Sequence, residues 1–318
     1  MRTLTCVDLF AGMGGTSLGA SQAGLKVLLS ANHWPVAVAT HRLNHPDVDH
    51  VTQDLQQADF YTWPDFDVLL ASPACQGHSR ARGKEQPRHD ATRSTAWAVV
   101  SAAEAKRPSY LVVENVADFT RWQLYPQWRW CLEALGYALT EQVLNAADFG
   151  VPQERRRLFI VGVHKDAGPA LDIPQGTASH VAASTILDDA ATNWSAVNRP
   201  GRSAATLRRI ENGRRRFGGR FLAPFFGSGS GTTGRSLDRP LGTVTTKDRY
   251  CLVDGDRMRM LNAGEYRRAM GFPTTYRMPC VHKLAVRLLG NAVVPAVMKH
   301  ICEQLKAHHA GLSLRVAG

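Results

Sequence analysis

The chain has 318 residues, of which 44% are hydrophobic, and it carries a formal net charge of +11. This length allows one large domain with a smaller one, and the hydrophobic fraction excludes a disordered chain. No uninterrupted apolar run is long enough to cross a bilayer and the first residues lack a signal-peptide layout, so we expect a cytoplasmic protein without a membrane partner. The excess of basic residues favours a polyanionic partner such as nucleic acid.

Strand-like and helix-like segments alternate through the first half of the chain. Short apolar runs typical of buried strands occupy 4–10, 26–32, 66–72, 109–116 and 156–164. Between them, helical patterns occupy 16–24, 34–44, 95–107 and 128–136. This alternation predicts the α/β class with a doubly wound parallel sheet, in which ligands bind beyond the carboxyl ends of the strands.

The composition changes after residue 165. Residues 166–238 are rich in Gly, Ala, Ser, Thr and Arg, and their periodicity is weak. Within them, six arginines surround Glu211 in 206–221, and 225–236 is a flexible loop by composition. Helical patterns return at 262–272 and 293–310. We expect a large domain of residues 1–165 plus 282–318 and a small domain of residues 166–281.

A glycine-rich turn, DLFAGMGG at 8–15, follows the first strand and opens a helix. Its glycines allow the backbone to approach a ligand closely, and the helix N-terminus favours negative charge. The turn lacks the third glycine of the dinucleotide fingerprint, which disfavours a nicotinamide enzyme. A different nucleoside-type cofactor and a tight turn without any ligand both remain open at this point.

Six cysteines are present, and no two form a C-x-x-C pair, which argues against a zinc ribbon or a redox dithiol. Cys75 follows the strand 66–72 in a loop bounded by Gly, Ser and Pro. A cysteine in such a loop is either structural or a nucleophile. Cys75 and His78 have metal-like spacing, but no second pair accompanies them, so we expect no metal.

Six motifs in a fixed order resemble those of the cytosine-C5 DNA methyltransferases. They are DLFAGMGG at 8–15, SPACQ at 72–76, ENV at 114–116, QERRR at 153–157, Arg239-Pro240 with Thr243, Thr245 and Thr246, and GNAVVP at 290–295. The resemblance spans nearly the whole chain. It implies a Rossmann-like methyltransferase sheet with a small target-recognition domain, S-adenosylmethionine as cofactor, and double-stranded DNA as the partner.

The resemblance implies four catalytic residues: Cys75, Glu114, Arg155 and Arg157. The Cys75 thiolate would add to C6 of a flipped cytosine, which makes C5 nucleophilic toward the methyl group of S-adenosylmethionine. Glu114 would assist at N3. Arg157 would hold the exocyclic oxygen of the base and position Glu114, and Arg155 would contact a phosphate or the loop.

The implied cofactor contacts are Phe10, Gly12, Gly14, Gly15, Trp34, Asp54, Leu55, Pro73, Asn291 and Ala292. Trp34 matches the aromatic residue that packs on adenine, and Asp54 matches the acid at the adenine amino group. His33 stands where the family has an acid for the ribose. A histidine cannot accept two hydrogen bonds as a carboxylate can. Ala74 stands where many members have proline.

The implied DNA contacts fall in two segments. Gln76, Ser79, Arg80 and Arg82 belong to a basic loop that would close over the extruded base, while Arg209, Arg215 and Thr245 belong to the small domain. The resulting hypothesis is a sequence-specific, base-flipping DNA methyltransferase of a restriction–modification system or phage. We expect a nucleoid-associated monomer with a cognate restriction endonuclease.

Three alternatives stay open. One is an RNA methyltransferase, because the family has a transfer-RNA branch. Another is a DNA-binding protein with an inactive site, against which the presence of Cys75, Glu114 and Arg157 argues. The third, motivated by His33, is an enzyme that transfers a different group from a modified cofactor.

Overall fold

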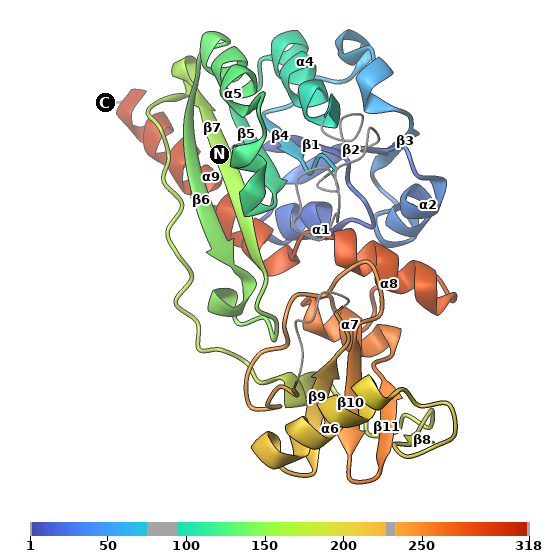
Figure 1. Cartoon of the computed structure of the whole chain (residues 1–318). Helices are drawn as coiled ribbons and strands as arrows, with labels where there is room; N and C mark the ends of the chain where they lie inside the picture. The colour runs from blue at the N-terminus through green and yellow to red at the C-terminus, as the bar shows by residue number, and fades with distance from the viewer. Residues whose placement is uncertain (1, 75–93, 227–232, 317–318) are drawn as a thin grey trace. The chain divides into compact units, whose positions relative to one another are not determined.

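The computed structural model describes residues 2–74, 94–226 and 233–316, with side chains up to residue 311. The chain divides into two compact units (Figure 1). Unit 1 comprises residues 1–145, 156–176 and 292–318, and unit 2 comprises residues 146–155 and 177–291. The expected assignment of a catalytic and a target-recognition domain stays a prediction.

Unit 1 is built on a seven-stranded sheet with the strand order β3-β2-β1-β4-β5-β7-β6. The strands are β1 (Thr5–Leu9), β2 (Lys26–Asn32), β3 (Asp49–Thr52), β4 (Val68–Ala71), β5 (Tyr110–Asn115), β6 (Tyr137–Asn145) and β7 (Arg156–His164). β1, β4 and β5 are almost fully buried because helices cover both faces, which explains their continuous apolar runs. The strand order reverses between β1 and β4, where a doubly wound sheet opens a crevice for ligands.

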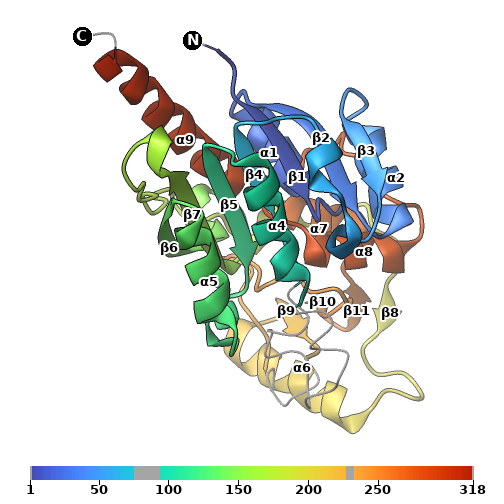
Figure 2. The same ribbon diagram turned by 90° about the horizontal axis from the view of Figure 1, so that it is seen from above.

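The helices of unit 1 are α1 (Gly15–Gln22), α2 (Pro35–Asn44), α4 (Trp97–Lys106), α5 (Tyr125–Ala134) and α9 (Pro295–Val316). Figures 1 and 2 show α1 and α9 on one face of the sheet and α4 and α5 on the other. Crossovers between parallel strands are right-handed, so the direction in which the chain moves along the sheet decides the face on which the connecting helix lies. The chain moves one way from β1 to β3 and the opposite way from β4 to β5, so α1 and α4 lie on opposite faces. The predicted α/β fold with a doubly wound, parallel-dominated sheet is confirmed.

One strand departs from the predicted parallel arrangement. β7 lies between β5 and β6 and is antiparallel to both. β6, for which the sequence pattern gave no prediction, alternates buried and exposed positions only weakly. The two strands form a hairpin whose connecting residues, 146–155, belong to unit 2. An antiparallel insertion needs no crossover helix, so alternation of helices and strands could not indicate it.

Unit 2 contains a four-stranded antiparallel sheet in the order β8-β11-β10-β9. Its strands are β8 (Ser195–Ala196), β9 (Arg220–Pro224), β10 (Tyr250–Asp254) and β11 (Arg257–Met260), and its helices are α6 (Ala204–Phe217), α7 (Ala263–Ala269) and α8 (His282–Asn291). α6 lies in the segment of weak periodicity, where no helix was predicted. Its start is capped by the Ser203 side chain, which accepts a hydrogen bond from Thr206 N. Its last turn carries three arginines, which complement the helix dipole.

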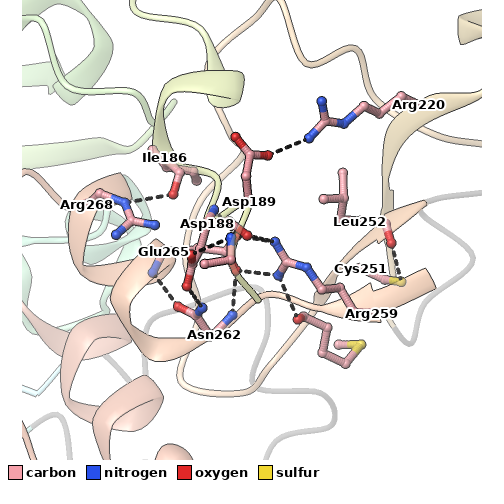
Figure 3. Close-up of polar contacts among 12 residues, drawn as sticks. Ile186, Asp188, Asp189, Arg220, Cys251, Leu252, Arg259, Asn262, Glu265 and Arg268 are labelled. Atoms are coloured by element: carbon pink, nitrogen blue, oxygen red, sulfur yellow. Dashed lines mark hydrogen bonds and ion pairs between the residues drawn. The ribbon is translucent and has the colours of Figure 1, made fainter. Parts of the chain in front are cut away.

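A buried ion pair connects the sheet of unit 2 to α7 and to the 186–189 segment (Figure 3). The Arg259 guanidinium donates to both carboxylate oxygens of Glu265, at 2.7 and 2.8 Å, and both side chains are almost fully buried. Arg259 also donates to the main-chain oxygen of Asp188 at 3.0 Å. Asn262 and Glu265 form a capping box at the start of α7. Glu265 therefore joins the sheet, the α7 terminus and the 186–189 segment.

Within the described residues, one helical stretch, His282–Gly311, is long and apolar enough by length and composition to cross a membrane. The apolar window is 61% buried. Its second half is α9, which packs closely on α1 inside unit 1: a Cβ added to Gly19 would lie 2.5 Å from Pro295 O. Burial in a protein core accounts for the apolar character of α9.

Candidate active site

The glycine-rich turn between β1 and α1 has an unusual backbone. Phe10, Gly12 and Gly14 have positive φ angles of 60°, 57° and 101°. Glycine adopts this region without strain, whereas Phe10 does so while carrying a side chain. Ala11 N donates to Ala31 O at 3.1 Å, which ties the turn to β2. The turn places the first amides of α1 at the carboxyl edge of the sheet, an arrangement that suits polar ligand atoms.

A buried polar network lies beside this turn. Ser17 Oγ donates to Asp8 Oδ2 at 2.7 Å, and His41 Nε2 lies 2.9 Å from Ser17 Oγ. His41 Nδ1 lies 2.8 Å from His50 Nε2. Burial raises the pKa of Asp8 to about 7 and lowers the pKa of His41 well below its usual range. The network connects β1, α1, α2 and β3, so it fixes the elements that carry the turn.

The side chains expected around adenine follow β2 and β3. Trp34 is half-buried at the start of α2, and its main-chain N donates to Asn32 Oδ1 at 2.9 Å. Asp54 is exposed and caps a short 3₁₀ turn, and Leu55 beside it is buried. His33 is exposed. These residues lie at the carboxyl ends of strands next to β1, where a doubly wound sheet places its ligands.

The remaining expected cofactor residues lie in different parts of the chain. Pro73 is buried just beyond β4 and belongs to unit 1, as does the buried Ala292. Asn291 is exposed at the end of α8 in unit 2. An open glycine turn, a half-buried indole ring and an exposed carboxylate in unit 1 form a donor set that fits a nucleoside-type cofactor.

The segment leading to the expected nucleophile is anchored to the sheet on both sides. Ser72 N donates to Leu9 O at 3.1 Å, and Asn115 Nδ2 donates to Pro73 O at 3.2 Å. Ala74 N donates to Thr95 Oγ1 at 3.2 Å. The chain is thus held by hydrogen bonds up to the residue before the nucleophile. Five predicted site residues lie outside the described residues: Cys75, Gln76, Ser79, Arg80 and Arg82.

Glu114 and Arg157 lie next to each other at the ends of adjacent strands. Glu114 pairs with Phe159 in the antiparallel β5–β7 register. Arg157 Nε is 3.3 Å from Glu114 Oε1, and the two side chains are only 17% and 10% exposed. Arg157 also donates to Arg156 O at 2.8 Å. The structure therefore brings together two of the predicted catalytic side chains within unit 1.

Arg155 has a different environment, within unit 2. It is 3% exposed and donates to the main-chain oxygens of Val244 and Gly290, both at 2.9 Å. Gln153 is fully buried nearby: its amide donates to Ala269 O and accepts from Val244 N. The hydrogen bonds of these two residues connect main-chain segments in the interior of unit 2. The expected contact of Arg155 with a phosphate or loop stays a prediction.

In unit 2, the side chains that are expected to contact DNA already interact with other groups of the protein. Arg209 lies over the Phe225 ring, with its guanidinium carbon 4.8 Å from the ring centre. Arg215 forms a largely exposed i,i+4 ion pair with Glu211. Thr245 Oγ1 donates to Lys247 O at 2.9 Å. Arg215 is therefore the most accessible of the three predicted residues, since its side chain is 74% exposed.

Three residues with clear structural roles were not among the predicted site residues. Asn115 binds the nucleophile segment, Gln153 braces unit 2, and Asp8 anchors the glycine turn. Asn115 and Gln153 stand inside the ENV and QERRR motifs, so motif membership was a usable signal. Asp8 ends an otherwise apolar strand, where a carboxylate requires a partner.

Comparisons with known proteins show the family of the chain. The sequence model of the family described as C-5 cytosine-specific DNA methylase matches residues 4–307. The Type II methyltransferase M.NlaX of Neisseria lactamica is 29% identical over 318 residues, covering 97% of this chain and 98% of that protein. M.BsuFI of Bacillus subtilis is 28% identical over 309 residues, covering 95% and 72%.

Solved structures show the same fold. A protein of an E. coli prophage, described as a DNA modification methyltransferase, has a TM-score of 0.72 at 20% identity, covering 96% of this chain and 99% of that one. A DNMT2 variant of Spodoptera frugiperda has a TM-score of 0.71 at 16% identity, covering 96% and 100%. Because the family match extends over residues 4–307 of 318, the protein belongs to the C-5 cytosine-specific DNA methylase family and is a DNA cytosine-5 methyltransferase.

Proposed function

We propose that the protein methylates C5 of a cytosine within a short duplex DNA site and uses Cys75 as a covalent nucleophile. The observation that carries this proposal is the ion pair between Glu114 and Arg157, 3.3 Å apart at the strand ends. Asn115, adjacent to Glu114, binds the carbonyl of Pro73, two residues before Cys75. These contacts support the proposal, because the carboxyl of Glu114, the guanidinium of Arg157 and the residues just before Cys75 lie at the ends of neighbouring strands, β5, β7 and β4.

The proposed reaction begins with addition of the Cys75 thiolate to C6 of cytosine, which shifts an electron pair toward N3. Glu114, in its protonated form, donates a hydrogen bond to N3, where charge develops, and the electron pair returns from N3 through C4 as C5 takes up the methyl group. Arg157 holds the Glu114 carboxyl and the exocyclic oxygen of the base. After C5 has been methylated, loss of the C5 proton and departure of the Cys75 sulfur restore the C5–C6 double bond. Arg155 acts as a positioning residue through its hydrogen bonds inside unit 2.

The residues of unit 1 fit S-adenosylmethionine, which supplies an electrophilic methyl group on a sulfonium when bound. The amides after Gly12 and Gly14 would face its polar atoms, and Trp34 would pack on the adenine ring. Asp54 would accept from the adenine amino group, because its carboxylate is exposed. Phe10, Gly15, Leu55, Pro73, Asn291 and Ala292 complete the proposed set. His33 would give the ribose one hydrogen bond.

The substrate must enter as an extruded base, because C6 is inaccessible within stacked DNA. Gln76, Ser79, Arg80 and Arg82 would contact the backbone beside that base, while Arg209, Arg215 and Thr245 of unit 2 would contribute to site recognition. We further propose a cytoplasmic monomer that protects DNA from a cognate restriction endonuclease. The Type II names of M.NlaX and M.BsuFI support this setting.

Covalent trapping tests the nucleophile. Duplex DNA containing 5-fluorocytosine should form a stable adduct with the wild-type protein in the presence of S-adenosylmethionine, because fluorine cannot leave as the C5 proton does. Cys75→Ala should abolish both the adduct and transfer of a labelled methyl group to DNA. Cys280→Ala, which removes an exposed cysteine in unit 2, is the matched control and should retain both.

Unchanged adduct formation in Cys75→Ala would refute the proposed nucleophile.

A substrate competition tests whether the substrate is DNA or RNA. Excess unlabelled duplex DNA should suppress labelling, whereas bulk transfer RNA should not. Preferential suppression by transfer RNA would instead support an RNA substrate.

A further inference from the structure

Unit 2 contains a pocket whose walls are dominated by arginine. Its volume is about 340 Å³, and it is lined by Glu154, Arg216, Phe217, Gly234, Arg235, Ser236, Arg239 and Pro240. The lining has three guanidinium groups and one carboxylate, a formal excess of two positive charges. We call it the arginine pocket. None of its residues belongs to the DNA contacts that the family resemblance implies.

Arg235 is held rigidly at the edge of the unit 2 sheet. Its main chain exchanges two hydrogen bonds with Leu222 of β9, at 2.7 and 3.0 Å. The preceding Gly234 packs so tightly that an added Cβ would lie 2.3 Å from the Phe221 ring. Gly242 leaves room for the guanidinium, since its added Cβ would lie 2.9 Å from an Arg235 nitrogen. The main chain of Arg235 is therefore fixed beside β9, and the absence of a side chain at Gly242 leaves room for its guanidinium group.

Glu154 and Arg239 are positioned by a second pair of segments. Glu154 N donates to Leu241 O at 2.7 Å, and Leu241 N donates to Pro152 O at 3.0 Å. The carboxylate of Glu154 lies between two arginines, 3.8 Å from Arg235 and 3.9 Å from Arg239. These separations exceed hydrogen-bond distances, so Glu154 orients the guanidinium groups without occupying their N–H donors.

Arg216 supplies the third cation from the last turn of α6. Its guanidinium carbon lies 5.4 Å from the centre of the Phe217 ring, which also lines the pocket. The Arg239 side chain is 79% exposed and that of Arg235 is 45% exposed, so an external anion can reach both. The pocket thus combines three cations, guanidinium donors that Glu154 does not occupy, and access from solvent.

We propose that the arginine pocket binds a phosphodiester group of the DNA backbone and so sets the register of unit 2 on its substrate. This inference rests on the proposed action on duplex DNA. Guanidinium groups match phosphate oxygens in a planar, two-point geometry. The excess of two charges suits the single charge of a phosphodiester. Contacts to phosphates fix the position and orientation of a protein on the duplex, while base contacts provide sequence information.

The salt dependence of DNA binding tests the pocket. The slope of log K against log salt concentration is negative, and each phosphate contact that is lost should reduce its magnitude by about 0.9. The triple variant Arg216→Gln, Arg235→Gln, Arg239→Gln should therefore bind a short duplex more weakly and with a slope reduced by about one. The single variant Arg239→Gln changes an exposed side chain and keeps the test valid if the triple variant fails to fold.

Arg257→Gln is the matched control, because it removes one positive charge from the same unit outside the pocket. Arg257 forms an exposed ion pair with Asp254 and lies over the Trp194 ring. Its salt slope should equal that of the wild type. Triple replacement by lysine should keep most of the slope while weakening binding, because lysine retains the charge and loses the planar fork.

Wild-type slopes in both glutamine variants, with a wild-type protein that binds and methylates duplex DNA, would overturn the arginine pocket and leave the proposed function intact. A wild-type protein that neither binds nor methylates duplex DNA would overturn both. Saturable binding of inorganic phosphate that requires the intact pocket but leaves DNA binding unchanged, at constant ionic strength, would assign the pocket to a free phosphate ligand instead.

Discussion

Asp8 shows how a single buried carboxyl can couple stability to pH. It is fully buried, and Ser17 is its hydrogen-bond donor. The nearby His41, His45 and His50 all have pKa values lowered chiefly by burial, so none supplies positive charge near neutral pH. Burial raises the pKa of Asp8 from 3.8 to about 7. Its ionisation therefore opposes folding, with a penalty that grows from pH 4 to pH 7.

We expect Asp8→Asn to stabilise the protein at high pH. Ionisation of Asp8 lowers the free energy of unfolding by about 4 kcal/mol above pH 7. This effect vanishes below pH 4, where Asp8 is protonated in both the folded and the unfolded state. The gain in unfolding free energy should be about 2–3 kcal/mol larger at pH 8 than at pH 5, measured by urea denaturation. Asp65→Asn, at an exposed carboxylate, should show no such difference. An equal effect of Asp8→Asn at both pH values would contradict this account.

At the scale of elements, the contact between α1 and α9 depends on a glycine. A Cβ at Gly19 would lie 2.8 Å from the Cβ of Met298 and 2.5 Å from Pro295 O. Neither a backbone oxygen nor a Cβ can rotate away. Gly19→Ala should therefore destabilise the protein by about 1–3 kcal/mol, although alanine is the better helix former.

Gly311 in α9 is the matched control, because a Cβ there meets nothing within 4 Å. Gly311→Ala should be neutral or stabilising by up to about 1 kcal/mol. Thermal unfolding of both variants measures the contrast. Stabilisation by Gly19→Ala would show that the two helices are farther apart than 2.5–2.8 Å contacts require.

Local sequence patterns predicted the elements with strong periodicity and missed those defined by distant partners. The runs at β1, β4 and β5 are mostly apolar, so their burial could be predicted. α6 buries only Ile210 and Gly213 and carries charge elsewhere, which weakened its pattern. The reversed direction of β7 depends on its pairing with β5 and β6, which no local pattern encodes.

The sequence motifs predict which residues form the candidate site, an assignment that stays a prediction, but they do not predict the geometry of those residues. Motif order identified Glu114 and Arg157, which the structure places 3.3 Å apart. Arg155 stands two positions before Arg157, yet it binds carbonyls in the interior of the other unit. Spacing within QERRR could not separate the two roles, because the chain leaves unit 2 between them.

At the scale of the whole molecule, two units should respond differently to the cofactor. Trp34, Asp54 and the glycine turn all belong to unit 1. S-adenosylhomocysteine at 100 times its dissociation constant should stabilise the unfolding transition that involves unit 1 by about 2.7 kcal/mol. Scanning calorimetry measures the shift. Trp34→Ala should reduce it, whereas Trp130→Ala, at an exposed tryptophan of α5, should not. A shift that survives Trp34→Ala unchanged would remove Trp34 from the cofactor site.

The interrupted connectivity of unit 2 has a practical consequence for exchanging this unit between relatives. Residues 146–155 belong to unit 2 but are separated in the chain from residues 177–291 by β7 and the segment after it. Gln153 and Arg155, in the short piece, bind main-chain atoms of Val244, Ala269 and Gly290 in the long piece. A chimera that transplants 177–291 alone would take these hydrogen-bonded partners from two different proteins. A functional transplant should carry both pieces as one module.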